Sequence, residues 1–346
     1  MTGATVHKTL MRQEIEEIPD AAARFLTASE ALLASAGQAL KRKNPAVVVT
    51  IARGSSDHAA NFLKYAIELG AGVPVASIGP SIVSIYGRSL KLDRAAAIAI
   101  SQSGKSPDIV AMTEAAKAGG ALAFAITNTP DSPLAATADY TVDLKAGAER
   151  SVAATKTFVN SVVAGLALLA HWTADEKLLA ALATLPVALR AAVDCDWSPL
   201  LEALDGHQSL YVLGRGPSLA IASEAALKFK ETCGIHAEAY SAAEVMHGPV
   251  RIVEGGFPLL VLAARDAAEP SVAGMADKLA AQGAATFVTS ERVSAARVLP
   301  FAVSGHPLTD ALVLVVSFYG FVEALSRRRG FDPDHPPHLN KVTETV

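Results

Sequence analysis

Hydroxyl and amide side chains gather at residues 101–108 (SQSGKSPD), directly after an apolar run that is typical of a buried strand. A helix that starts there offers free backbone N–H groups and the positive end of its dipole. Ser106 suits the N-cap of such a helix, and Pro107 suits its first position. Further donors in the segment are Ser101, Gln102 and Ser103. The pattern indicates either a phosphate monoester site or a capped helix behind a polar turn.

Three ionisable residues with helical spacing form a second candidate. Glu224, Lys228 and Glu231 stand at i, i+4 and i+7, so they share one helix face. A His-Gly-Pro turn follows at His247. Such a face is either a salt-bridged surface exposed to solvent or part of a site where a carboxylate and a histidine act as general base and general acid.

The segment 332–341 (DPDHPPHLNK) is the third candidate, although its composition is typical of a terminal loop. Its two histidines, His335 and His338, lack a third ligand, and the Cys233/His236 pair lacks a second pair at ligand spacing. We therefore expect neither a metal nor a cofactor.

The elements that must position these residues occur twice along the chain. Residues 46–52 (AVVVTIA) predict a buried strand, which ends at an Arg-Gly turn and is followed by a helical pattern. Residues 210–213 (LYVL) begin the same sequence of features, with Arg53 matching Arg215 at an offset of 162 residues. Strands that alternate with helices predict parallel sheets.

The predicted strands of the two copies are residues 46–52, 95–100, 121–127 and 140–144, then 210–213, 259–263, 284–289 and 298–303. Helical patterns cover 8–43, 155–195 and 308–328. We expect an α/β protein with two tandem three-layer sandwiches, each a parallel β-sheet flanked by helices. The expected divisions are an N-terminal helical arm (1–43), two sandwich domains (44–190 and 191–330) and a C-terminal tail (331–346).

The two copies differ at the polar turn. At the place of residues 101–104 the second copy has residues 263–266 (AARD), where the serine donors are missing. A purely structural cap would be expected in both copies. We therefore expect one phosphate site per chain, in the first half.

Bulk properties exclude several classes of function. The chain of 346 residues has a formal net charge of −4 and no basic run, which argues against a nucleic-acid partner. Residues 1–17 lack the apolar core of a signal peptide, and the apolar run near 161–170 is shorter than the roughly 20 residues that span a bilayer. Two cysteines indicate a reducing compartment. We expect a cytoplasmic protein without a membrane partner.

Five ordered motifs resemble those of the sugar isomerase (SIS) family, and in particular the isomerase half of glucosamine-6-phosphate synthases. They are SQSGKSPD (101–108), ERSVAATKTF (149–158), LGRGPS (213–218), EAALKFKETCGIHAEAYSAAEVMHGP (224–249) and DPDHPPHLNK (332–341). The resemblance covers residues from about 40 to the C-terminus.

The resemblance implies roles for individual residues. Glu231 would move a proton between C1 and C2 of the sugar, oriented by Glu224 and Lys228. His247, contributed by a neighbouring subunit of a homodimer, would assist ring opening, and Lys341 would form a Schiff base with an open-chain ketose. The sugar phosphate would be held by Ser55, Ser101, Gln102, Ser103 and Ser106, and the sugar site lined by Val152, Ala153 and Thr155.

Departures from the family pattern direct the choice of reaction. The chain enters the first isomerase half directly, so we expect no glutaminase domain and no glutamine donor. Met246 replaces the usual lysine and Ala154 a common serine. The expected reaction is isomerising deamination, from glucosamine 6-phosphate and water to fructose 6-phosphate and ammonia. The alternatives are an aldose–ketose isomerase, a fructosamine-6-phosphate deglycase, a galactosamine-6-phosphate deaminase and a non-catalytic sugar-phosphate sensor.

Overall fold

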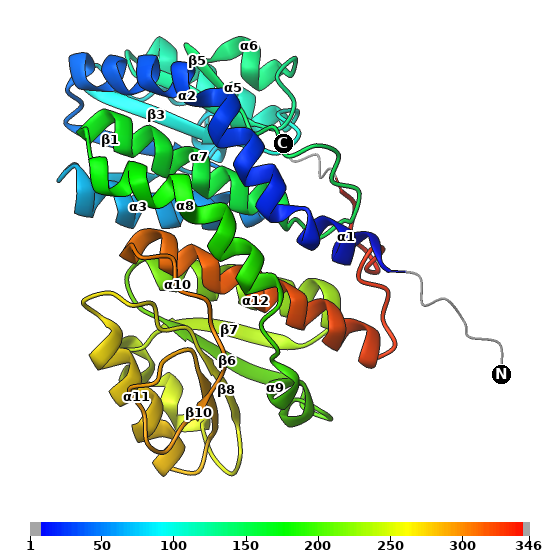
Figure 1. The fold of residues 1–346 in the computed structure, drawn as a ribbon. Helices are drawn as coiled ribbons and strands as arrows, with labels where there is room; N and C mark the ends of the chain where they lie inside the picture. Colours follow the sequence, from blue (N-terminus) through cyan, green and yellow to red (C-terminus); the bar gives the residue numbers. More distant parts are fainter. Residues whose placement is uncertain (1–7, 342–346) are drawn as a thin grey trace.

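Two five-stranded parallel sheets, each flanked by helices, make up the protein (Figure 1). The computed structural model describes residues 8–341. The first sheet has the order β2-β1-β3-β4-β5 and the second the order β7-β6-β8-β9-β10, so the two halves repeat one topology. This confirms the predicted pair of tandem α/β sandwiches. The strands are β1 (Val47–Ile51), β2 (Val75–Ser77), β3 (Ala95–Ile100), β4 (Leu122–Thr127), β5 (Tyr140–Asp143), β6 (Ser209–Gly214), β7 (His236–Ser241), β8 (Pro258–Val261), β9 (Ala285–Val288) and β10 (Arg297–Val298).

Helices cover both faces of each sheet and join the halves. The α-helices are α1 (Leu10–Glu16), α2 (Ile18–Lys43), α3 (Gly54–Gly70), α4 (Ser81–Ser84), α5 (Pro107–Ala118), α6 (Pro133–Thr137), α7 (Lys156–Thr173), α8 (Glu176–Val193), α9 (Ser198–Ala203), α10 (Pro217–Cys233), α11 (Glu269–Ala281) and α12 (Pro307–Arg328), and two 3₁₀ helices are η1 (Glu244–His247) and η2 (Pro249–Ile252).

Alternation along the strands separates the two faces of the first sheet. Val48 and Ile98 join the large core between the halves, whereas Val49 and Ala97 pack with Met112 of α5 on the other face. Successive side chains of a strand point to opposite faces, so both faces of a central strand must be apolar. This is why β1 and β3 read as continuous apolar runs.

One core is shared by both halves. Phe62 of α3, Val162 of α7, Phe229 of α10 and Phe318 of α12 belong to the same buried cluster. Figure 1 shows α10 and α12 lying between the two sheets. Among the described residues, α12 is the one helix that is long and apolar enough to cross a membrane, but almost all of it is buried in this core. It is longer than the apolar run near 161–170, which lies within α7.

The predicted strands differ from the observed ones in three places. β2 and β7 were not predicted, and the strand expected at 298–303 is reduced to Arg297–Val298. β2 has three residues, and β7 (HAEAYS) contains polar residues because it forms an edge of its sheet. An edge strand has one pairing partner and exposes more of its surface, so it lacks the apolar signature of a central strand.

The two ends of the described chain meet. The carboxylate of Asp334, in the tail, accepts hydrogen bonds from the backbone N–H groups of Leu10 and Met11, both at 2.7 Å. These N–H groups lie at the first turn of α1, where an anion is favoured by the helix dipole. The C-terminal tail is thereby tied to the N-terminal arm.

A glycine at the contact between α2 and α7 provides a test of the packing. A Cβ atom on Gly37 would lie 2.8 Å from backbone atoms of His171 and Trp172, which cannot move without shifting α7. We expect Gly37→Ala to lower the free energy of unfolding, measured in urea, by about 1–3 kcal/mol. The control is Gly274→Ala in α11, where a Cβ meets nothing within 4 Å, and which should raise it by up to about 1 kcal/mol. Equal effects would contradict the close contact.

Candidate active site

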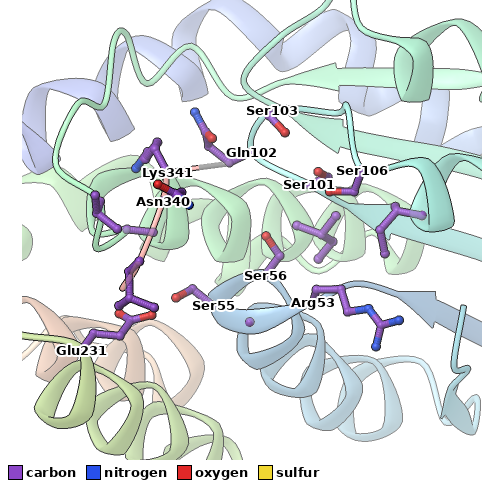
Figure 2. A pocket seen from close by; sticks show the side chains of 16 residues that line it. Arg53, Ser55, Ser56, Ser101, Gln102, Ser103, Ser106, Glu231, Asn340 and Lys341 are labelled. Carbon is purple, nitrogen blue, oxygen red and sulfur yellow. The ribbon is translucent and has the colours of Figure 1, made fainter. Parts of the chain in front are cut away.

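A cavity of about 340 Å³ lies at the carboxyl ends of β1 and β3 (Figure 2). Because β2 and β3 flank β1 on opposite sides, this is the point where the strand order reverses, and open α/β sheets bind ligands there. The lining residues are Arg53, Gly54, Ser55, Ser56, Ile100, Ser101, Gln102, Ser103, Ser106, Ile109, Val152, Ala154, Glu231, Leu339, Asn340 and Lys341. All five residues predicted to hold the phosphate are among them.

The polar turn after β3 has the geometry of an anion site. Ser106 is the N-cap of α5 and Pro107 its first residue, as predicted, but the Ser106 side chain makes no capping bond to the helix. Its hydroxyl is therefore available to a ligand at the helix N-terminus. Gly104 adopts φ +62°, and a Cβ there would lie 2.1 Å from Ser132 Oγ, so the turn requires glycine.

A buried lysine, Lys228 of α10, joins the start of α3 on one side of the cavity to Glu231 on the other. Lys228 Nζ donates to Ser55 Oγ at 2.9 Å and to Glu231 Oε2 at 2.6 Å, and lies 3.2 Å from Glu224 Oε1. The side chains of Lys228 and Glu224 are 0% exposed, whereas that of Glu231 is 21% exposed and faces the cavity. The alternative of a solvent-exposed salt-bridged face is therefore wrong.

Burial perturbs the charges of this cluster. It raises the pKa of Glu224 to about 7, although the charge of Lys228 and a hydrogen bond from Tyr319 Oη act in the opposite direction. Burial also acts to lower the pKa of Lys228, but the charges of Glu224 and Glu231 outweigh it and the pKa lies above its ordinary value. Lys228 thus stays a cation beside the Glu231 carboxylate.

The loop 149–155 forms a third wall. Val152 and Ala154 line the cavity, whereas Ala153 and Thr155 are buried behind the loop. The resemblance implied Val152, Ala153 and Thr155, so two of these three side chains do not reach the cavity in the described chain. Thr155 instead precedes α7 as its N-cap and donates its backbone N–H to Glu149.

The exposed His247 is not brought to this cavity within one chain. It ends η1 and lines a separate hollow of about 460 Å³ with Tyr240, Ser241 and Glu244. Its proposed role requires a second subunit and stays a prediction.

The second half has no equivalent anion site at residues 263–266. Arg265 Nε donates to Asp310 Oδ2 at 2.5 Å and Arg265 Nη1 to Thr289 O at 2.7 Å. Asp310 is buried, so the chain's own ion pair occupies the position that corresponds to the polar turn. The asymmetry between the copies thus has a structural basis.

Several residues at or behind the cavity were not predicted. Arg53 lines it and pairs with Asp108, and Asn340 lines it beside Lys341. Glu14 accepts backbone bonds from Arg150 and Ser151 and so supports the loop 149–155. Arg53 stands in the repeated Arg-Gly turn, which could have indicated it. No sequence pattern marks Glu14, whose partners are distant in the chain.

Comparison with known proteins shows which family the chain belongs to. A family model described as the SIS domain matches residues 41–171 and again 204–292. The chain belongs to the SIS domain family. The first match contains all five strands of the first sheet, and the second contains β6 to β9 of the second sheet.

Individual relatives share the site-bearing region. A glutamine–fructose-6-phosphate aminotransferase (isomerizing) from Aeropyrum pernix is 33% identical over 96% of this chain and 56% of its own length, so the chain spans about half of that relative. A crystal structure described as a phosphosugar isomerase from Silicibacter pomeroyi is 56% identical, with a TM-score of 0.92 over 94% of this chain and 100% of that chain. The C-terminal domain of glucosamine-fructose-6-phosphate aminotransferase from Francisella tularensis is 27% identical, with a TM-score of 0.82 over 97% and 100%.

The raised pKa of Glu224 predicts a pH-dependent stability. The folded pKa of about 7 lies above the ordinary 4.5, so this group's contribution to stability is complete below pH 4.5 and is lost as the pH rises through 7. From about pH 5 to about pH 8, the urea midpoint of the wild-type protein should fall more steeply than that of Glu224→Gln, which cannot titrate. Parallel pH profiles for the two proteins would show that Glu224 is already ionised at pH 5.

Proposed function

We propose that the protein is an isomerising deaminase of an amino-sugar phosphate, and that its substrate is glucosamine 6-phosphate. The observation that carries the proposal is a carboxylate, Glu231, in the wall of a cavity whose other side is a serine-lined helix N-terminus. The first group suits proton transfer on a sugar and the second suits its phosphate. The isomerising and phosphosugar relatives of the SIS domain family support the same class of substrate.

The reaction balances without an external oxidant or cofactor. In the open-chain aminoaldose, Glu231 removes the proton from C2 and returns it to C1. O1 takes up a proton and the amino group gives one up, so C1 is reduced to an alcohol while C2 becomes an imine. Water adds to the C2 imine, the C–N bond breaks, and fructose 6-phosphate and ammonia leave. Lys228 Nζ, held 2.6 Å from Glu231 Oε2, orients the carboxylate before it takes up the proton.

Two variants separate proton transfer from phosphate binding. With glucosamine 6-phosphate and no glutamine, we expect ammonia and fructose 6-phosphate in equal amounts. Glu231→Gln should lower kcat by about 10²–10⁴-fold while ligand binding survives. Ser106→Ala should raise KM by about 5- to 150-fold, the equivalent of one charge-assisted hydrogen bond of about 1–3 kcal/mol.

The wild-type result decides between reactions. No ammonia from any aminosugar phosphate, together with turnover of plain aldose phosphates to ketose phosphates, would replace the deaminase by an aldose–ketose isomerase. Turnover of fructosamine or galactosamine 6-phosphate alone would change the substrate and retain the site. Binding of these phosphates without turnover of any would favour a sensor.

We also propose that the working unit is a homodimer in which His247 reaches the cavity of the other subunit. Its exposure in the described chain, away from Glu231, supports this. Co-expressed Glu231→Gln and His247→Ala chains are each inactive alone, but their heterodimer contains one intact shared site out of two. The random mixture should therefore regain about a quarter of wild-type activity, and the isolated heterodimer about half. Activity measured after co-purification through two different tags tests this, and no recovery in an isolated heterodimer would place both residues in a single-chain site.

A further inference from the structure

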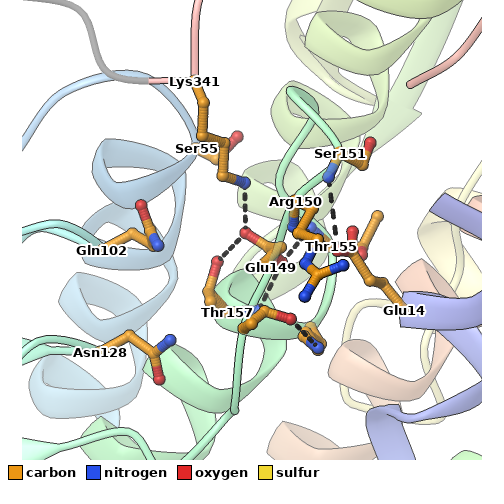
Figure 3. Close-up of polar contacts among 12 residues, drawn as sticks. Glu14, Ser55, Gln102, Asn128, Glu149, Arg150, Ser151, Thr155, Thr157 and Lys341 are labelled. Atoms are coloured by element: carbon orange, nitrogen blue, oxygen red, sulfur yellow. Dashed lines mark hydrogen bonds and ion pairs between the residues drawn. The ribbon is translucent and has the colours of Figure 1, made fainter. Parts of the chain in front are cut away.

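The last described residue of the tail forms an ion pair with a buried carboxylate (Figure 3). Lys341 Nζ lies 2.7 Å from Glu149 Oε2. The Glu149 side chain is 0% exposed, whereas that of Lys341 is 23% exposed and also lines the catalytic cavity. The pair therefore joins the tail to the loop wall of the site.

Glu149 is held in place independently of the tail. Its Oε1 accepts the backbone N–H groups of Thr155 at 3.1 Å and Thr157 at 3.0 Å, and its Oε2 accepts the Thr157 hydroxyl at 2.7 Å. These donors lie at the N-terminus of α7, whose dipole favours an anion. Burial would raise the pKa of Glu149, but the Lys341 charge and these hydrogen bonds outweigh it and lower the pKa below its ordinary value.

The tail is anchored at its other end by Asp334. The Asp334 carboxylate accepts from the first turn of α1, and its backbone carbonyl accepts from Val152 N at 3.2 Å. Between Asp334 and Lys341 the chain carries Leu339 and Asn340 to the cavity wall. Their position thus depends on an anchor at each end of the segment 335–341 and on the buried Pro336 near its start.

We propose that Glu149 is a positioning residue that docks the tail by holding the Lys341 ammonium group. When the pair is formed, Leu339, Asn340 and Lys341 close the cavity. When the pair is broken, residues 337–341 are released while Asp334 and the buried Pro336 stay attached. A buried anion that has lost its cation is costly, so the docked state is favoured in the absence of substrate. This docking is a property of the free protein, and only its effect on turnover rests on the proposed function.

The competing explanation is that Glu149 only shapes the loop 149–155 and does not hold the tail. Substitutions of Glu149 and of Lys341 distinguish docking of the tail from this structural role. In Glu149→Gln the amide oxygen can still accept from Thr155 and Thr157, so the loop is retained while the charge is lost. Lys341→Met removes the same ion pair from the partly exposed tail. The matched control is Glu17→Gln, which removes a carboxylate paired with Lys156 at the same end of α7 without touching the tail.

The experiment is hydrogen–deuterium exchange of peptides that contain residues 335–341, measured without substrate. We expect exchange to quicken about tenfold or more in Glu149→Gln and in Lys341→Met, and to stay at the wild-type rate in Glu17→Gln. In the double variant, exchange should be no faster than in either single variant, because both remove one interaction. Peptides from β3 and β4 should be unchanged in all four proteins, which reports an intact sheet.

An exchange rate equal to that of the wild type in Lys341→Met would overturn the proposal, even if Glu149→Gln failed to fold. Additive effects on the exchange rate in the double variant would show that Glu149 acts on the loop instead.

In an activity assay, Glu149→Gln should lower kcat/KM for glucosamine 6-phosphate about tenfold, and Glu149→Asp should recover part of it. If the wild-type protein turns over no aminosugar phosphate, the proposed function fails while the exchange results still decide the docking of the tail.

Discussion

A lysine ammonium group buried between the two halves is the interaction on which the site depends. Lys228 is wholly buried, and an unpaired charge there would be strongly destabilising. It is satisfied by two carboxylates of its own helix, Glu224 and Glu231, and by the hydroxyl of Ser55 from the first half. The same contacts that satisfy this charge hold the Glu231 carboxylate at the cavity wall. The contacts that pack the two halves together therefore also fix the position of the Glu231 side chain.

The repeat supplies two similar sheets, but the chain uses them differently. The first sheet carries the candidate anion site at its strand reversal, where the Ser106 side chain makes no capping bond at the start of α5. In the second sheet, Arg265 and Asp310 neutralise each other at the matching position. The second half instead contributes α10, which carries Lys228 and Glu231. One composite site per chain follows from this division, because each half lacks what the other supplies.

Carboxylates also join the ends of the chain to the site. Glu14 of α1 holds the backbone of Arg150 and Ser151, and Asp334 links the tail to the first turn of α1. Glu149 then receives Lys341. Each carboxylate accepts two backbone N–H groups, so the same bonds that stabilise the loop also define the cavity. The N-terminal arm is thus part of the support of the site.

Local sequence determined the central strands and the helix start at Ser106 and Pro107, because strand burial and helix capping depend on the types of neighbouring residues. It also determined the repeat and its asymmetry, because both can be seen by aligning the two halves of the sequence. The five residues predicted to hold the phosphate, and Glu231, followed from the motifs and their resemblance, and all of them line one cavity in the structure. Only tertiary structure decided that Lys228 is buried, that Ala154 rather than Ala153 or Thr155 faces the cavity, and that Glu14, Glu149 and Asp334 converge on one loop. These outcomes depend on contacts between residues more than a hundred positions apart, and on side-chain directions that spacing along a loop does not encode.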